Sequence, residues 1–497
     1  MKKAIVIGSG FSGLSSATYL AKAGWQVTVI EKHDIPGGRA RKFEAGGFVF
    51  DMGPSWYWMP DVFERYFENF GKKRSQYYSL KRLDPSYKIF WEEEEMEIPA
   101  DYGELKKLFE KIEKGSGEKL DKYLAQAEYK YKVGINKLVK KPGRSWLEFL
   151  DWDLIKGVFK LDVFSSIKSH IQKNFRNSKL RQLLEFPVLF LGALPKDTPA
   201  LYSLMNYADI KGGTWYPEKG MYSVVDAMYQ LAVESGVVFR FSENVTSIQV
   251  SGKKAVGVTV ERLNETSQTK NYDCNVIVAS ADYHFVEEKL IPEKYRSYDE
   301  KYWEKRVLAP GCLLYFVGLN KKLKEITHHS LFFDVDFERH GKQIYETKEW
   351  PTEPLFYVSA TSVTDDTSAP AGYENLFFLI PVSAGLAGDS EELRKKYFEK
   401  IIARFEKRIG EPIKEHIVYK KSFGPTDFVN DYNAYKGNAY GLANTLMQTA
   451  VLKPSCRSNK IENLFYTGQL TVPGPGVPPS LISGEVVAKE VIKHFGA

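Results

Sequence analysis

The hydrophobic pattern at the start of the chain predicts a strand, a helix and a second strand. Residues 4–7 (AIVI) form a short apolar run that is typical of a buried strand. A glycine-rich turn follows, and then a helix from about Gly13 to Ala23, with Gly24 as its stop. Residues 25–31 (WQVTVIE) predict the second strand. This βαβ opening requires a parallel sheet with a right-handed crossover.

The next hundred residues predict a hairpin followed by helices. Residues 86–98 read as strand, turn and strand, and Asp101 then caps a helix with apolar residues at helical spacing. A second helix is predicted at about 118–140, and the block 145–205 is helical throughout. This block interleaves aromatic and basic side chains, namely Trp146, Phe149, Trp152, Phe159, Phe164 and Phe175 with Lys156, Lys160, Lys168, Lys173, Arg176, Lys179 and Arg181.

Strand patterns return in the second half of the chain. They fall at 237–262 and 275–280, a mixed block spans about 286–450, and 463–468 (NLFYTG) precedes a Gly/Pro loop and a final helix. Because the strands return after long intervals, we expect the first domain to be assembled from several distant chain segments.

Composition narrows the class of protein. Hydrophobic residues make up 43% and charged residues 27%, and mean hydropathy is −0.34, which is the balance of a globular chain. The net charge is +6, and basic and acidic residues are mixed along the chain, so we expect no nucleic-acid partner. Aromatic residues reach 14%, which fits a large apolar cavity or an interfacial surface. The three scattered cysteines predict neither a disulfide framework nor a metal site.

The sequence predicts no membrane-spanning segment. Its most apolar stretch, Leu183 to Leu194, is interrupted by Glu185 and Pro187 and is shorter than the roughly 18 to 20 residues that a bilayer requires. The first residues imitate a signal peptide, but glycines break the apolar run at once, so we predict an intracellular protein.

The first motif that carries chemistry is Gly8-x-Gly10-x-x-Gly13, placed between the first strand and helix. The first glycine permits the tight turn, the second lets a pyrophosphate approach the backbone, and the third allows close helix–strand packing. Glu31 ends the second strand, where a carboxylate can accept a hydrogen bond from an adenosine ribose. The motif indicates a dinucleotide site and leaves open whether NAD or FAD occupies it.

The stretch from Glu31 to Ser55 favours FAD. It runs EKHDIPGGRARKFEAGGFVFDMGPS, and it resembles the extended signature of the flavoprotein class that includes amine oxidases, protoporphyrinogen oxidases and carotenoid desaturases. Gly37 and Gly38 let the backbone pass close to a long cofactor, and Arg39 can hold a phosphate. Gly53-Pro54 is a rigid turn that can lie against the isoalloxazine ring.

Two more segments resemble the same class. Residues 212–226 (GGTWYPEKGMYSVVD) resemble a segment that runs beneath the flavin into a helix, with Lys219 where the family often has glycine. Val245 occupies the position whose backbone usually meets the adenine.

The C-terminal stretch from Asn463 to Ile492 resembles the closing motif of bacterial carotenoid desaturases. In that family the backbone at the position of Gly468 runs past the pyrophosphate and ribityl chain of FAD. Gln469 occupies a position where relatives often have an acidic residue that binds the ribityl or ribose hydroxyls. The run Gly476-Val477-Pro478 presents backbone N–H groups to the flavin carbonyl at a helix N-terminus, which stabilises negative charge.

Taken together, these motifs resemble the phytoene desaturase family, including desaturases of hydroxylated carotenes at the 3,4 bond. The resemblance implies an α/β fold with a glutathione-reductase-like, Rossmann-type FAD-binding domain, a mixed-sheet substrate domain and a helical membrane-facing subdomain. It implies FAD-binding segments 1–75, 205–285 and 455–497, substrate-domain segments 76–100 and 286–454, and a helical segment 101–204. The positions assigned to non-covalent FAD are Gly8, Gly10, Phe11, Ser12, Gly13, Glu31, Lys32, Gly38, Arg39, Gly53, Pro54, Ser55, Val245, Gly468, Gln469, Gly476, Val477 and Pro478.

The same resemblance implies dehydrogenation of a C–C bond in a C40 carotene, with hydride transfer to the flavin and oxygen or a quinone as electron acceptor. Phytoene and a 1-hydroxylated carotene such as hydroxy-γ-carotene both remain open as substrates, and no general base is singled out by spacing. Trp56, Tyr57, Trp58, Trp215 and Tyr216 are candidates to line a polyene tunnel. We expect the block 145–205 to bind the inner face of the cell membrane, where such a substrate resides.

Two other functions remain as alternatives. One is a flavin oxidase of the same class that acts on an amine or a porphyrinogen. The other is an isoprenoid carrier of the GDP-dissociation-inhibitor type, which shares the fold without using flavin. The intact cofactor loops argue against the carrier.

Overall fold

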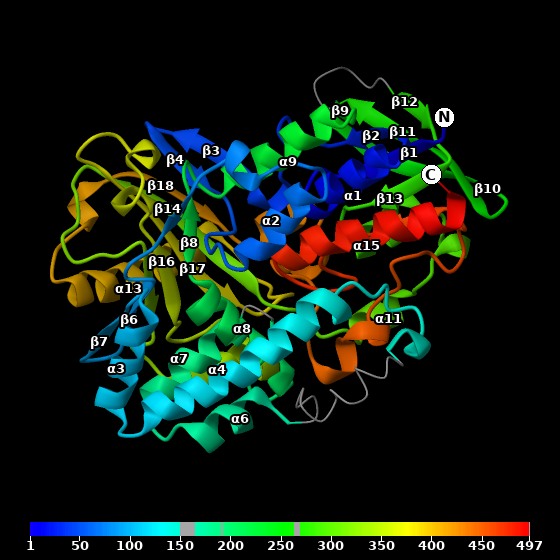
Figure 1. The fold of residues 1–497 in the computed structure, drawn as a ribbon. Helices are drawn as coiled ribbons and strands as arrows, with labels where there is room; N and C mark the ends of the chain where they lie inside the picture. The colour runs from blue at the N-terminus through cyan, green and yellow to red at the C-terminus, as the bar shows by residue number, and fades with distance from the viewer. Residues whose placement is uncertain (150–164, 190–191, 263–268, 497) are drawn as a thin grey trace.

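Three large sheets and a block of helices organise the described part of the chain (Figure 1). The computed structural model describes residues 1–149, 165–189, 192–262 and 269–496. The predicted α/β class is confirmed. The predicted division of the chain into domain segments stays a prediction.

The first sheet is parallel and has five strands in the order β19-β13-β1-β2-β9. Its strands are β1 (Lys3–Ile7), β2 (Gln26–Ile30), β9 (Val238–Arg240), β13 (Val276–Ala279) and β19 (Leu464–Tyr466). Val6 on the central strand β1 and Val278 on its neighbour β13 are fully buried, as expected for a parallel sheet with both faces covered. The sheet therefore joins segments from both ends and the middle of the chain.

Helices α1 (Phe11–Lys22) and α15 (Val477–Phe495) pack together on this sheet, as the blue and red helices of Figure 1 show. A side chain at Gly484 would place its Cβ 2.5 Å from the Ser12 carbonyl oxygen, so this glycine permits the close approach. Gly24 ends α1 with a φ of +88°, as predicted. Helix α9 (Tyr222–Glu234) lies against α1 from the other side.

A three-stranded antiparallel sheet packs near the parallel one through a shared apolar core. Its strands are β10 (Glu243–Ser251), β11 (Lys254–Arg262) and β12 (Thr269–Asp273). The first two lie within the predicted strand region 237–262. The sequence did not predict β12, because its residues (TKNYD) are polar and four of the five are exposed.

The third sheet has seven strands in the order β18-β14-β17-β16-β15-β6-β7. Its strands are β6 (Tyr87–Phe90), β7 (Glu95–Ile98), β14 (Gly311–Leu319), β15 (His329–Phe332), β16 (Phe356–Ser359), β17 (Glu374–Val382) and β18 (Ile417–Phe423). The predicted hairpin at 86–98 forms β6 and β7, and β6 joins β15 in parallel. One face of the sheet packs on α13 (Glu391–Ile409), and alternation along each strand turns the remaining side chains to the other face.

The helical block contains α3 (Tyr102–Ile112), α4 (Ser116–Val133), α6 (Ile167–Asn174), α7 (Ser178–Leu189) and α8 (Leu204–Tyr207). Asp101 caps α3 as predicted, since its Oδ1 accepts from Glu104 N at 2.9 Å. The predicted second helix ends earlier than expected, at Val133, and a π-helical turn follows over Gly134–Leu138.

The aromatic residues predicted to meet a membrane are only partly described. Trp152, Phe159 and Phe164, with Lys156 and Lys160, lie outside the described residues. Phe175 is fully buried between the rings of Phe109 and Tyr123, at centroid distances of 5.8 and 5.9 Å, so the prediction of an interfacial role is wrong for this residue. None of the described helices is both long and apolar enough to cross a bilayer.

A buried carboxyl group on α7 makes stability depend on pH. Burial raises the pKa of Glu185 to about 7, although Lys168 and Arg181 oppose the shift. Between its ordinary pKa and 7 the folded state binds a proton that the unfolded chain does not, so this group's contribution to stability falls as pH rises. We expect Glu185→Gln to stabilise the protein by about 2–3 kcal/mol at pH 8 and by little at pH 5. Thermal unfolding at both pH values measures this, with the exposed Glu93→Gln as control. An equal gain at both pH values would contradict it.

Candidate active site

A cavity of about 470 Å³ lies between the carboxyl end of the first sheet and side chains of the third sheet. The residues just beyond the carboxyl ends of four parallel strands line it, which is where α/β sheets bind ligands. These residues follow β1, β2, β13 and β19. One half of the cavity is lined by the glycine turns and the other half by apolar side chains.

The three glycines of the first turn play three different structural roles. Gly8 takes a φ of +97°, which favours glycine. Gly10 lines the cavity in an ordinary backbone conformation, and a Cβ there would meet no heavy atom within 4 Å. Gly13 does not line the cavity, and its Cβ would lie 2.1 Å from the Gly8 carbonyl oxygen. The space above Gly10 is therefore open, while Gly13 holds the helix against the strand.

Glu31 lies at the end of β2 and lines the cavity, with 5% of its surface exposed. Its Oε2 accepts from the backbone N–H and the hydroxyl of Ser9, at 2.8 and 2.7 Å, and Oε1 accepts from His33 N at 3.0 Å. The carboxylate thus fixes the glycine turn to the second strand and keeps lone pairs for a ribose hydroxyl. Lys32 and Val245 line the same end of the cavity.

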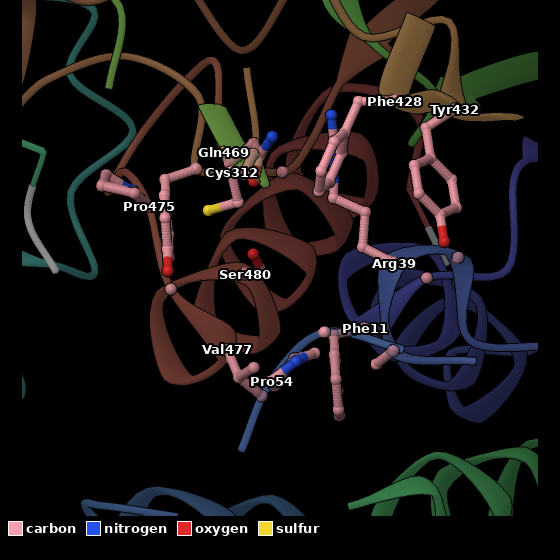
Figure 2. A pocket seen from close by; sticks show the side chains of 18 of the residues that line it. Phe11, Arg39, Pro54, Cys312, Phe428, Tyr432, Gln469, Pro475, Val477 and Ser480 are labelled. Carbon is pink, nitrogen blue, oxygen red and sulfur yellow. The ribbon is translucent and has the colours of Figure 1, made fainter. Parts of the chain in front are cut away.

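Arg39 reaches into the cavity toward Gln469, opposite Phe11, Pro54 and Val477 (Figure 2). With the Gln469 amide oxygen facing it, Oε1 accepts from Nη1 at 2.9 Å and from Nη2 at 3.1 Å. The Arg39 Nε is buried and has no partner. Burial lowers the pKa of Arg39, and Asp282 opposes that shift. A buried, unpartnered guanidinium N–H fits a phosphate or hydroxyl oxygen of a bound cofactor.

Sequence reasoning missed Asp282, which also lines the cavity. Its Oδ1 accepts from Phe285 N and its Oδ2 from Tyr435 N, each at 3.2 Å, and burial raises its pKa. A signal was available, because Asp282 closely follows the predicted strand 275–280 at the same sheet edge as Gly8 and Glu31. Tyr432, whose ring lies 5.6 Å from the Arg39 guanidinium, carried no such signal.

The Gly53-Pro54-Ser55 turn lines the cavity where its two halves meet. A Cβ on Gly53 would lie 2.5 Å from the Arg39 carbonyl oxygen, so the turn packs directly on that backbone. Trp56 and Trp58 line the apolar half as predicted. Tyr57, Trp215 and Tyr216 do not line it, so the expectation of a tunnel wall is wrong for these three.

The segment 212–226 leads into helix α9 as its resemblance implied, but none of its residues lines the cavity. The segment is instead bonded to the residue before the Met52-Gly53 turn, because the Asp51 carboxylate accepts from Met221 N at 2.7 Å and from Tyr222 N at 2.9 Å. Lys219, at the position where glycine was expected, takes a φ of +68°. The segment therefore supports the strand that leads to Gly53.

The C-terminal loop closes the cofactor half. Gly468 (φ +111°) and Gly476 (φ +107°) both line the cavity, and Gly476 is the N-cap of α15. Val477 and Pro478 follow, but proline has no backbone N–H. Of the predicted trio, only Gly476 and Val477 can donate to a ligand.

The apolar half is lined by the inner face of the third sheet and by helical segments. Along β14, Cys312 and Leu314 face the cavity, while Leu313 and Tyr315 face α13. Among the described residues that line this half, none carries a carboxylate, ammonium or guanidinium group. They are Trp56, Trp58, Met59, Phe186, Leu189, Leu194, Met205, Pro310, Cys312, Leu314, Leu331, Phe333, Phe337, His340, Gly341, Ile344, Tyr345, Leu355, Phe356, Tyr357, Leu379, Pro381, Ala439 and Tyr440.

This architecture defines the class of FAD-dependent oxidoreductases with a Rossmann-type cofactor domain. The open space above Gly10 and the unpartnered Arg39 Nε both fit FAD. The chain belongs to the family of flavin-containing amine oxidoreductases, whose model matches residues 11–492. The predicted class and its FAD cofactor are thereby confirmed.

Curated relatives span the full chain. A carotenoid 3,4-desaturase of Haloarcula japonica is 39% identical over 492 residues, which cover 99% of this chain and 98% of the relative. A zeta-carotene-forming phytoene desaturase of Myxococcus xanthus is 29% identical and covers 99% and 94% of the two chains. The resemblance to the carotenoid desaturases is thereby confirmed.

Solved structures share the fold at low sequence identity. An oxidoreductase from Methanosarcina mazei superimposes with a TM-score of 0.62 at 14% identity, covering 98% of this chain and 100% of the other. Putrescine oxidase bound to putrescine gives a TM-score of 0.60 at 13% identity, with 99% of each chain covered.

Proposed function

We propose that the protein is an FAD-dependent carotenoid desaturase that introduces C=C bonds into a C40 carotene. One observation carries this proposal: the cofactor half of the cavity continues into an apolar half without a charged side chain among its described residues. An uncharged hydrocarbon is the ligand class that such a lining accommodates, because a buried charge without a partner is strongly unfavourable. The full-length similarity to a carotenoid 3,4-desaturase and a phytoene desaturase supports it.

The cofactor positions follow the order of the motifs. We assign Glu31, Lys32 and Val245 to the adenosine end, and the turn from Gly8 to Gly13 to the pyrophosphate. Arg39 and Gln469 would hold the phosphate or ribityl oxygens. The turns at Gly53 and Gly476 would hold the isoalloxazine end. The full set is Gly8, Gly10, Phe11, Ser12, Gly13, Glu31, Lys32, Gly38, Arg39, Gly53, Pro54, Ser55, Val245, Gly468, Gln469, Gly476, Val477 and Pro478, in which Gly13 acts through packing.

FAD held by these residues would supply a two-electron acceptor for the hydride that leaves an allylic carbon of the carotene. The protein's own residues orient the polyene and exclude water. Trp56 and Trp58 lie two and four residues after Pro54 and line the apolar half, so we expect them to meet the substrate where it approaches the cofactor. The aromatic and aliphatic walls hold the reacting bond in place, which lowers the entropic part of the barrier.

Two other functions fit the observations less well. An amine substrate carries a positive charge, and the apolar half offers no carboxylate among its described residues to neutralise it. An isoprenoid carrier would not need the open space above Gly10 or the unpartnered Arg39 Nε.

The proposed function is tested with purified protein, FAD and liposomes that contain either phytoene or a 1-hydroxylated carotene. We expect a red shift of the polyene spectrum with one of the two, and the responsive substrate identifies the branch. Oxygen and a quinone are compared as electron acceptors in the same assay. No shift with either substrate, despite bound FAD, would favour the amine or porphyrinogen oxidases. A protein that does not bind FAD would favour the isoprenoid carrier.

We also propose that the protein binds peripherally to the inner face of the cell membrane, since the substrate resides in the bilayer. Two of its most exposed large apolar side chains are Leu147 and Met447, at 74% and 71%. Their segments touch, because a Cβ on Gly143 would lie 3.0 Å from the Ala450 carbonyl oxygen. Lys173 and Arg176 on the helical block are exposed and can meet anionic head groups, whereas Lys168 pairs with Glu338 at 2.5 Å.

We expect the double substitution Leu147→Ser and Met447→Ser to weaken binding to anionic vesicles by at least about tenfold, because each side chain loses its burial in the interface. Co-sedimentation measures this, with Val418→Ser on strand β18 as the control for an exposed apolar residue elsewhere. Reversing the charges of Lys173 and Arg176 should weaken binding mainly at low salt. Unchanged co-sedimentation of both variants would reject this placement.

A further inference from the structure

A histidine and a tyrosine on neighbouring strands form a buried polar pair at the cavity wall. His329 lies on β15 and Tyr357 on β16, and the His329 Nδ1 is 2.7 Å from the Tyr357 Oη. Tyr357 lines the cavity, whereas His329 lies behind it and is fully buried. The tyrosine hydroxyl is therefore the member of the pair that a substrate can approach.

The pair lies where the cofactor half meets the apolar half. The Trp56 ring stacks on the His329 ring with centroids 4.1 Å apart and an interplanar angle of 13°. Ser55 lies close enough to Tyr357 to lower its pKa. Because Ser55 and Trp56 directly follow Gly53-Pro54, the pair is adjacent to the turn assigned to the isoalloxazine ring.

One buried polar atom of the pair, the Nε2 of His329, lacks a partner. Ser359 lies opposite His329 on the neighbouring strand, and its hydroxyl lowers the pKa of Tyr357 as that of Ser55 does. A buried polar atom without a partner costs about 1–3 kcal/mol, so such atoms are uncommon without a functional reason. This local arrangement is thus unfavourable for stability alone.

Both groups of the pair are uncharged in the folded protein. Burial lowers the pKa of His329 well below its ordinary value, and the neighbouring His328 lowers it further. Burial also raises the pKa of Tyr357. A neutral imidazole that carries its proton on Nε2 presents Nδ1 as the acceptor for the Tyr357 hydroxyl.

We propose that Tyr357 is the catalytic residue that takes the proton released from the carotene, while passing its own proton to the Nδ1 of His329. This inference rests on the proposed function. One allylic C–H bond breaks with its electron pair, which goes to the oxidised flavin as a hydride. The neighbouring C–H bond then releases its proton to Tyr357 Oη, and its electron pair forms the new C=C bond. The substrate thus loses two electrons and two hydrogen nuclei, and His329 carries the second proton until it leaves.

A weak base suffices for this step. A C–H bond next to a carbon that has lost a hydride is strongly acidic, because its electron pair can neutralise the positive charge. The pair therefore has to lie close to the reacting C–H bond rather than be strongly basic. The hydrogen-bonded Tyr357 at the cavity wall meets this requirement. His329 in turn is a positioning residue that accepts the tyrosine proton.

The test compares Tyr357→Phe, His329→Gln and the double variant in anaerobic single turnovers, which follow the flavin absorbance and the polyene spectrum. We expect each single variant to slow the polyene signal by about a hundredfold, because this signal reports the loss of the second hydrogen, which follows hydride transfer. We expect the double variant to be no slower than either, because residues that act as a unit give non-additive effects. FAD content, quenching of tryptophan fluorescence by bound carotene, and KM should remain near wild-type values.

The matched control is Tyr315→Phe, which removes another buried tyrosine hydroxyl from the opposite face of the same sheet. Its Oη donates to the Arg394 carbonyl at 2.6 Å, so its loss should lower the unfolding temperature without slowing turnover. Wild-type rates in Tyr357→Phe, or additive losses in the double variant, would overturn the inference. Loss of FAD or of carotene binding in the single variants would assign the pair a structural role instead. A wild-type protein that desaturates neither carotene would reject the proposed function itself.

Discussion

Replacing Gly10 by valine should remove FAD binding and leave the fold intact. Gly10 has φ −70° and ψ 177°, a conformation that valine adopts readily, and a Cβ there meets no protein atom within 4 Å. The valine methyl groups would fill the space assigned to the pyrophosphate. We expect FAD affinity to fall by at least about a hundredfold, or about 3 kcal/mol. Flavin absorbance per protein and equilibrium titration of the apoprotein with FAD measure this change.

The controls separate the cofactor effect from folding. Gly103→Val on the exposed first turn of α3 should keep its FAD. Gly13→Ala should damage the fold itself, since its Cβ would lie 2.1 Å from the Gly8 carbonyl oxygen. The unfolding temperature of apo Gly10→Val should match that of the wild-type apoprotein. A Gly10→Val protein that retains a full complement of FAD would contradict the assignment of this turn.

Replacing Gly341 by phenylalanine should block the carotene and spare FAD. Gly341 lies on α12 (Phe337–Lys342) and lines the apolar half. A Cβ there would lie 2.7 Å from the Cδ2 of Leu194, which also lines the cavity, so the new ring and Leu194 must share the space meant for the polyene. We expect carotene turnover to fall at least about tenfold, with overpacking costing about 1–3 kcal/mol of stability.

Gly341→Ala provides the graded control. It displaces only the far end of Leu194, so it should lose less turnover than the phenylalanine variant. FAD content should remain at the wild-type level in both variants, because Gly341 lies outside the set of residues assigned to the cofactor. Wild-type turnover in Gly341→Phe would show that the polyene does not occupy this part of the cavity.

The sequence predicted the cofactor half well, because its signals are local. The run from Lys3 to Glu31 combines two strands, a turn and a helix in one contiguous stretch, and the structure places its turn and its end at one sheet edge. Where two backbone segments approach closely, only glycine fits, so the requirement can be recognised in the sequence without knowledge of the rest of the fold. Of the positions assigned to FAD, only Gly13 does not line the cavity.

The substrate half could not be predicted in the same way, because it is assembled from long-range pairings. His329 and Tyr357 meet only because β15 pairs with β16, and the alternation that turns Cys312 toward the cavity depends on which face α13 covers. The errors have the same origin. Tyr216 and Phe175 are aromatic residues in suggestive stretches, yet tertiary packing turns the first away from the cavity and buries the second in a core.

One carotene C–C bond should be desaturated for each FAD that is reduced. An anaerobic titration tests it directly: the holoenzyme is mixed with liposomes that contain the responsive carotene, without oxygen or quinone. Loss of flavin absorbance and the amount of lengthened polyene are measured on the same sample. We expect equal amounts of reduced flavin and new double bonds, with further product formed only after an electron acceptor is added. Polyene lengthening without flavin reduction, or flavin reduction without a new double bond, would contradict it.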